Sequence, residues 1–115
     1  MLLGLTTSVR APWTVVHLHG ELDMATAPRL RQEVVGLVDT GERYLVLDLS
    51  DVDFCDSTGI GVLVAAVKRA RVAGGDVRVV CTNDRLLQMF ALTRLDRVFE
   101  VFDVVDAALD PSEAG

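Results

Sequence analysis

A serine preceded by several aspartates is the segment of this 115-residue chain whose side chains are best suited to chemistry. Asp51, Asp53 and Asp56 come shortly before Ser57, and Thr58 follows it. An amphipathic helical pattern begins directly afterwards, so the Ser57 hydroxyl is predicted to lie at or beside a helix cap, exposed to solvent. A phosphate there would face unpaired N–H groups and the positive end of the helix dipole, while adding a charge of about −1.5 to −2. Ser57 is therefore either a simple cap or a regulatory modification site.

The same aspartates, together with Asp48, could also suggest a metal cluster or an aspartate nucleophile. No lysine or further acidic motif completes either site, so we interpret the carboxylates as turn residues at an acidic rim. Ser57 lacks the Gly-x-Ser-x-Gly elbow of hydrolases, and the chain has no glycine-rich phosphate loop followed by a lysine. We expect a protein that is not an enzyme and that needs no metal and no cofactor.

Histidines and cysteines receive structural interpretations. His17 and His19 alternate onto one face of a predicted strand, and we expect no cysteine or carboxylate close enough to complete a metal site or a general base. Both are therefore predicted to face solvent. Cys55 adjoins the Ser57 segment and is interpreted as a small core residue rather than a redox sensor. Cys55 and Cys81 are far apart in sequence, and we expect two reduced thiols.

The composition limits the possible partners. The formal net charge of −6 opposes direct binding to nucleic acid, which depends on clustered lysine and arginine. No apolar stretch reaches the ~20 residues that a membrane-spanning helix needs, and the N-terminus does not resemble a signal peptide. We therefore expect a cytoplasmic protein that does not insert into membranes. Half of the residues are hydrophobic, which is enough for one compact core.

Hydrophobic periodicity and turn residues predict one domain over residues 1–110 and a flexible tail over residues 111–115. Strands are expected at residues 5–10, 13–18, 44–49, 77–81 and 98–102. Helices are expected to begin after Thr26 and around Ser57, and to span residues 85–92 and 104–109. The first two strands form a hairpin, and the later strands alternate with helices. The predicted fold class is α/β, with a mixed, mostly parallel sheet, an N-terminal hairpin and about four helices.

Two sequence motifs resemble a known family. Residues 45–50 (LVLDLS) and 52–63 (VDFCDSTGIGVL) are similar to the signature of STAS domains, specifically those of bacterial anti-sigma factor antagonists. Residues 20–23 (GELD) resemble the second family motif, which ends the hairpin and begins the first helix. The resemblance extends from about Leu5 to Leu109, so it covers almost the whole chain.

The resemblance implies a partner-switching cycle. An unphosphorylated antagonist binds an anti-sigma factor serine kinase, an ATPase of the histidine-kinase-like class, and thereby frees a sigma factor. The kinase phosphorylates the antagonist, the complex dissociates, and a metal-dependent serine phosphatase resets the cycle. Ser57 matches the phosphorylated serine. Thr58 departs from the many relatives that have a second serine, and it leaves a hydroxyl beside Ser57.

The resemblance also indicates which residues contact the partner. Asp23 and Asp56 match acidic residues that flank the serine, and Gly59 and Gly61 match glycines that let the helix start approach a partner. The full predicted contact set is Asp23, Met24, Thr26, Asp56, Thr58, Gly59, Ile60 and Gly61.

Two other functions remain open. The chain could be a STAS adaptor module of a transporter or a stress-signalling complex, in which the serine is not phosphorylated. It could also be a weak nucleotide binder.

Overall fold

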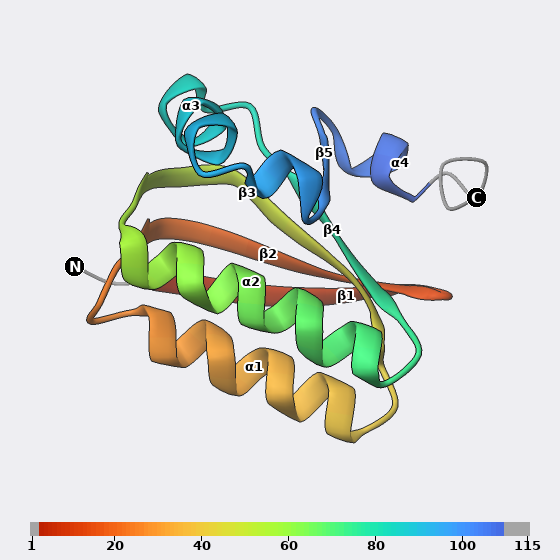
Figure 1. Cartoon of the computed structure of the whole chain (residues 1–115). Helices are drawn as coiled ribbons and strands as arrows, with labels where there is room; N and C mark the ends of the chain where they lie inside the picture. The colour runs from red at the N-terminus through yellow and green to blue at the C-terminus, as the bar shows by residue number, and fades with distance from the viewer. Residues whose placement is uncertain (1–2, 110–115) are drawn as a thin grey trace.

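A computed structural model describes residues 3–109, and this part of the chain contains a five-stranded mixed sheet with helices on both faces (Figure 1). In chain order the elements are β1 (Leu3–Arg10), β2 (Trp13–Leu22), α1 (Ala27–Asp39), β3 (Tyr44–Cys55), α2 (Ser57–Val72), β4 (Asp76–Val80), α3 (Asp84–Leu92), a 3₁₀ turn η1 (Leu95–Arg97), β5 (Glu100–Phe102) and α4 (Val105–Ala108). The predicted tail, residues 111–115, and the last residue of the predicted domain lie outside the described residues.

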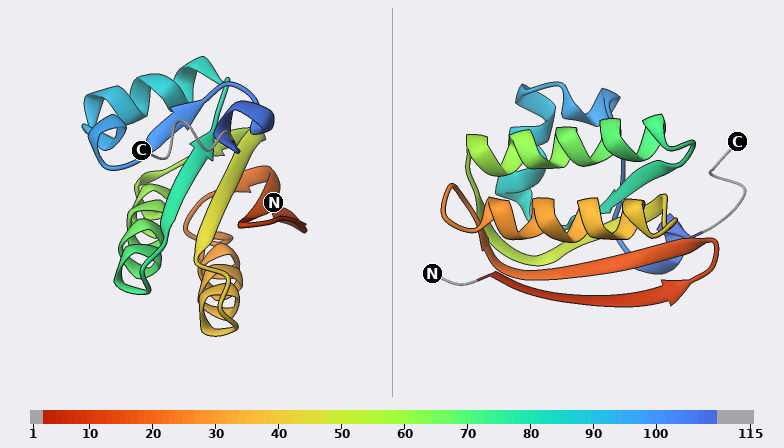
Figure 2. Two further views of the ribbon diagram at one scale, coloured as in Figure 1. Left: turned by 90° about the vertical axis from the view of Figure 1, so that its right-hand side faces the viewer. Right: turned by 90° about the horizontal axis from the view of Figure 1, so that it is seen from below.

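The strands lie in the sheet in their sequence order, β1-β2-β3-β4-β5. β1 and β2 form an antiparallel hairpin, and every later pair of neighbours is parallel. Helical crossovers between parallel strands have a fixed hand, so strands added in one direction place α1 and α2 on the same face of the sheet. Figure 2 shows these two helices side by side on that face. The predicted α/β fold with an N-terminal hairpin and four helices is confirmed.

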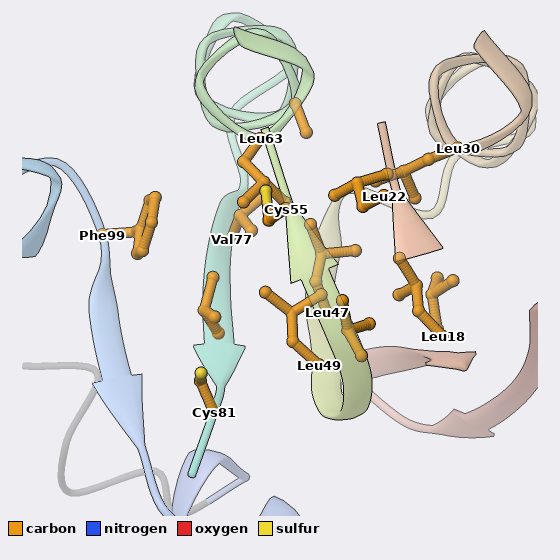
Figure 3. Close-up of a cluster of buried hydrophobic side chains, with 14 of the residues drawn as sticks. Leu18, Leu22, Leu30, Leu47, Leu49, Cys55, Leu63, Val77, Cys81 and Phe99 are labelled. Atoms are coloured by element: carbon orange, nitrogen blue, oxygen red, sulfur yellow. The ribbon is translucent and has the colours of Figure 1, made fainter. Parts of the chain in front are cut away.

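The main core lies between the sheet and its helices. Leu47 and Leu49 of β3, Leu63 of α2 and Leu22 at the end of β2 are buried there (Figure 3). Phe90 of α3 belongs to the same core. A smaller cluster on the opposite face joins Trp13 and Val46 to Ala108 of α4. Burial on both faces explains why β3 begins with an almost continuous apolar run. This packing holds the end of β3 and the start of α2 in fixed positions.

β1 begins two residues earlier than predicted, and β2 and β3 both continue further at their C-terminal ends. β2 continues to Leu22, and β3 continues to Cys55, because the extensions pair with each other: His19 lies opposite Asp51, and Leu22 opposite Cys55. The register shifts twice along this pairing, which marks bulges in the ladder. Asp51 and Asp53 are therefore strand residues, and the interpretation of these carboxylates as turn residues was wrong.

The helices differ in how their first turns are capped. Asn83 caps α3, since its side-chain oxygen accepts hydrogen bonds from the N–H groups of Arg85 (2.9 Å) and Leu86 (3.2 Å). Thr26 occupies the cap position of α1, but its hydroxyl does not cap the helix. β5 is shorter than predicted, because the segment before it forms the 3₁₀ turn η1.

Candidate functional site

The site is built where β3 passes into α2. Ser57 is the first residue of α2 and is exposed, as predicted. The cap itself is Asp56, whose Oδ1 accepts a hydrogen bond from the N–H of Gly59 at 2.9 Å. Within residues 3–109 no hydrogen bond of the Ser57 hydroxyl is present, so this hydroxyl is free to react without breaking one. The N–H groups of a helix's first turn have no acceptor within the helix, so the positive end of the α2 dipole faces this surface.

Asp56 also joins two loops. Its Oδ2 accepts a hydrogen bond from the N–H of Met24, in the loop between β2 and α1, at 3.1 Å. That loop is shaped by Asp23, whose Oδ1 accepts hydrogen bonds from the N–H groups of Ala25 (2.9 Å) and Thr26 (3.0 Å). Asp56 therefore caps α2 and positions the neighbouring loop, whereas Asp23 fixes the shape of that loop.

The predicted contact residues divide into exposed and buried groups. Met24, Thr58 and Gly61 are exposed near Ser57, and Ile60 is partly buried against the core. Thr26 is buried, and its hydroxyl donates to the carbonyl oxygen of Glu21 at 2.7 Å. Thr26 therefore stabilises the loop and offers little surface to a partner, and its role as a contact residue stays a prediction.

The two glycines of the motif do different things. A Cβ atom on Gly59 would lie 2.6 Å from the backbone oxygen of Leu22 and 2.8 Å from Sγ of Cys55, whereas a Cβ on Gly61 would have nothing within 4 Å. Gly59 lets α2 approach the ends of β2 and β3, and it is buried. The close approach at Gly59 is therefore to the chain's own strands, whereas Gly61 is open to a partner; the partner contacts of both glycines stay predictions.

Phe54 is a surface residue that the sequence analysis missed. Its relative exposure is 48%, and that of Met24 is 74%. Phe54 is close to Ser57 in the sequence, and Met24 is held near Ser57 by its hydrogen bond to Asp56. A shallow hollow of about 160 Å³ next to Phe54 is also lined by Arg85 and Met89 of α3. An aromatic residue among aspartates on an exposed strand could have signalled this surface.

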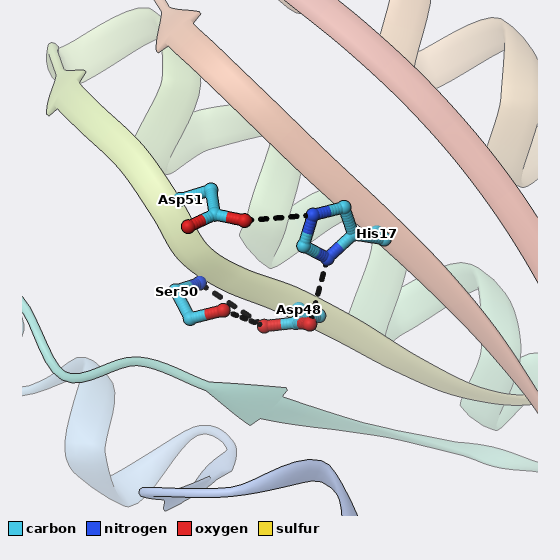
Figure 4. Close-up of polar contacts among 4 residues, drawn as sticks. All are labelled: His17, Asp48, Ser50 and Asp51. Atoms are coloured by element: carbon cyan, nitrogen blue, oxygen red, sulfur yellow. Dashed lines mark hydrogen bonds and ion pairs between the residues drawn. The ribbon is translucent and has the colours of Figure 1, made fainter.

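His17 contacts two carboxylates of β3, contrary to the prediction. Its Nδ1 lies 2.8 Å from Oδ2 of Asp48, and its Nε2 lies 3.0 Å from Oδ2 of Asp51 (Figure 4). Ser50 completes the cluster by donating from its hydroxyl to Oδ1 of Asp48 at 2.7 Å. His19, which lies on the same strand, is exposed as predicted.

The charges of this cluster stabilise one another. The hydrogen bond to Asp48 raises the pKa of His17, burial opposes the increase, and the negative charges of Asp48 and Asp51 add to it. Burial alone would raise the pKa of Asp48, but hydrogen bonds from Ser50 and His17 outweigh it and lower that pKa. A neutral imidazole has only one N–H donor, so contact with both carboxylates favours the imidazolium form. The cluster joins β2 to β3 on the face opposite α1 and α2.

Within residues 3–109 the cysteines and the possible metal ligands do not form a reactive centre. Cys55 is buried, and this burial raises the pKa of its thiol to about 12, so the thiolate is scarce near neutral pH. Among the described residues no group of three histidine, cysteine, aspartate or glutamate side chains could hold a metal ion. In the same part of the chain no helix is long and apolar enough to cross a membrane.

Comparison with known proteins gives consistent matches. The family model described as STAS domain matches residues 5–108. The anti-sigma-B factor antagonist of Bacillus subtilis is 35% identical over 86 residues, which are 75% of this chain and 78% of that protein. The protein of the same name from Staphylococcus aureus is 28% identical over 101 residues, or 88% of this chain and 94% of that protein.

A solved structure supports the same assignment. The crystal structure of an anti-sigma factor antagonist from Mycobacterium paratuberculosis matches this chain with a TM-score of 0.85 and 32% sequence identity. The match covers 93% of this chain and 91% of the chain in that structure. The family model covers nearly every described residue, including both motifs and the β3–α2 junction. This chain therefore belongs to the STAS domain family.

Proposed function

We propose that this protein is an anti-sigma factor antagonist whose binding is switched off by phosphorylation of Ser57. In its unphosphorylated form it binds an anti-sigma factor serine kinase, an ATPase of the histidine-kinase-like class, and so releases a sigma factor. The kinase then transfers the γ-phosphoryl group of ATP to the Ser57 oxygen, and a metal-dependent serine phosphatase removes it. The protein acts in the cytoplasm as a binding protein rather than an enzyme, without direct contact to nucleic acid.

The observation that carries the proposal is the exposed Ser57 hydroxyl at the first residue of α2, beside a cap supplied by Asp56. Because Asp56 and not Ser57 accepts the hydrogen bond that caps the helix, phosphorylation removes no hydrogen bond found among the described residues. The added phosphate also lies at the positive end of the helix dipole. The fold should therefore tolerate the modification, and its effect should be confined to binding.

The surface around Ser57 explains why a phosphate would end binding. Met24 and Phe54 provide exposed apolar area, and Asp56 already contributes one carboxylate. Further negative charge at a desolvated contact can cost several kcal/mol, or 10²-fold or more in affinity. The exposed members of the predicted contact set, Met24, Thr58 and Gly61, are proposed to contact the kinase together with the partly buried Asp23, Asp56 and Ile60.

The proposal is tested by incubating the protein with its kinase and Mg-ATP and locating the phosphate by mass spectrometry. We expect one phosphate on Ser57, none on the Ser57→Ala variant, and normal phosphorylation of Thr58→Ala. Phosphate on Thr58 alone would move the switch to the neighbouring hydroxyl. No phosphate on either residue, with kinase binding retained, would favour the non-phosphorylated adaptor.

A further inference from the structure

A second surface lies between α1 and α2, away from Ser57. Three adjoining hollows lie along the two helices, and all three are lined by Arg69 of α2. Arg31 and Val35 of α1 line two of them, and Ala65 of α2 links one of these two to the third. The two larger hollows measure about 440 and 360 Å³. We call this surface the α1–α2 groove, and its other lining residues are Pro28, Gln32, Val34, Gly36, Val62, Ala66, Lys68 and Val72.

The groove is open on the side facing away from the sheet. Figure 2 shows α1 and α2 next to each other with the sheet behind them, and the described chain places no element over their outer faces. Gly36 and Ala65 keep the walls low, and Val72 at one end is 90% exposed. A partner segment could therefore bury apolar surface here without rearrangement of either helix.

The charge of the groove is opposite to that of the protein. α2 contains Lys68, Arg69 and Arg71 and no acidic residue, although the whole chain has a net charge of −6. Arg71 pairs with Asp76. Within residues 3–109, Arg31, Lys68 and Arg69 form no ion pair, and no acidic side chain is among the residues that line the groove. The groove thus offers three cations above an apolar floor.

We propose that the α1–α2 groove binds an amphipathic helix of a partner protein whose apolar stripe is flanked by aspartate and glutamate. The apolar stripe would pack on Val35, Ala65 and Val72, and the carboxylates would pair with the three cations. Helices commonly dock into apolar grooves in this way. Arg69 lies twelve residues after Ser57 on one helix, about 18 Å along its axis, so the groove is separate from the proposed phosphorylation surface.

Two other anionic partners fit less well. A membrane surface attracts clusters of four to eight basic residues, whereas this groove has three. Nucleic acid would be repelled by the remaining surface, since the chain as a whole is acidic. A narrow groove with apolar walls matches a helix better than either.

The test uses a synthetic helical peptide of 18 residues containing only leucine, alanine and glutamate, with the leucines on one face. We expect the peptide, titrated to 1 mM into ¹⁵N-labelled protein, to bind with a dissociation constant below about 0.5 mM and to shift the amide signals of groove residues. The double variant Arg31→Glu/Arg69→Glu should bind at least about 10-fold more weakly. Arg94→Glu, an exposed charge reversal outside the groove, should change affinity less than about twofold.

Several results would overturn the proposal: no binding at 1 mM, equal binding by the double variant, or equal binding of a peptide with lysine in place of glutamate. Sedimentation with phosphatidylglycerol vesicles that is lost in the double variant would instead assign the groove to a membrane. Thermal melts of each variant verify that it is folded. Ser57→Asp should bind the peptide like the wild type, so a failure of this test leaves the proposed Ser57 switch unaffected.

Discussion

At the start of α2, Gly59→Ala should lower the stability of the protein, whereas Gly61→Ala should raise it. The added methyl group at Gly59 would lie 2.6 Å from the Leu22 backbone oxygen, 2.8 Å from Cys55 Sγ and 2.9 Å from Leu22 Cγ. Relieving such overlap costs about 1–3 kcal/mol, and we expect the upper half of this range because one of the three contacts is backbone. Alanine in place of glycine returns at most about 1 kcal/mol of helix propensity. The net loss for Gly59→Ala should be about 1–2 kcal/mol.

Gly61→Ala is the matched control. It lies two residues further along the same helix, and a Cβ there meets nothing within 4 Å. The variant should therefore gain up to about 1 kcal/mol from helix propensity alone. For a domain of this size, 1 kcal/mol corresponds to about 4 °C in Tm, so the two variants should differ by about 8–12 °C.

Thermal melts and urea unfolding of both variants check this reasoning. Equal Tm values, or a Gly59→Ala protein more stable than the wild type, would show that α2 does not depend on close contact with the end of β2. Because Gly61→Ala should lose no stability, this variant also allows kinase affinity to be measured without a folding defect.

Three further predictions concern neighbouring groups. Asp56→Ala should lose about 0.5–2 kcal/mol of stability because it removes the cap, whereas Ser57→Ala should change it by less than about 0.5 kcal/mol; melts of both variants test this. Because the folded-state pKa of His17 is raised, the stability that His17 contributes should be complete below its unfolded-state pKa of about 6.5 and lost as pH rises through the higher folded-state pKa. Urea unfolding should therefore show the wild type to be more stable than His17→Gln at pH 5.5, with a smaller difference at pH 8.5. An equal difference at both pH values would contradict this. Because the pKa of the buried Cys55 thiol is raised to about 12, Cys55 in the native protein should react with a disulfide reagent at pH 8 more slowly than Cys55 in the urea-unfolded chain. Rapid labelling of Cys55 in the native protein would contradict its burial.

The sequence predicted the fold because local signals agreed with the global arrangement. Alternating strands and helices with dense apolar runs require a largely parallel sheet. The ends of β2 and β3 were missed because aspartate and glycine are disfavoured in strands, and pairing between the two extensions outweighs that preference. Local composition carries no information about such pairing.

The placement of the candidate site residues was predicted where it depends on local sequence, and it was missed where it depends on long-range contacts. The position of Ser57 follows from the helix start alone. The burial of Gly59 follows from contact with Leu22, more than thirty residues earlier, and the carboxylates around His17 come from the parallel register that places Asp48 opposite it. Recognising β2 and β3 as neighbours would have brought His17 and Asp48 together.

The most direct test of the Ser57 switch is calorimetric titration of the anti-sigma factor kinase with the Ser57→Ala and Ser57→Asp variants, beside a thermal melt of each. Aspartate suits the positive end of the α2 dipole, so Ser57→Asp should fold at least as stably as Ser57→Ala. Its affinity for the kinase should nevertheless be about 10²-fold lower, because it places a permanent charge on the contact surface. Equal affinities of the two variants for the kinase would contradict the switch.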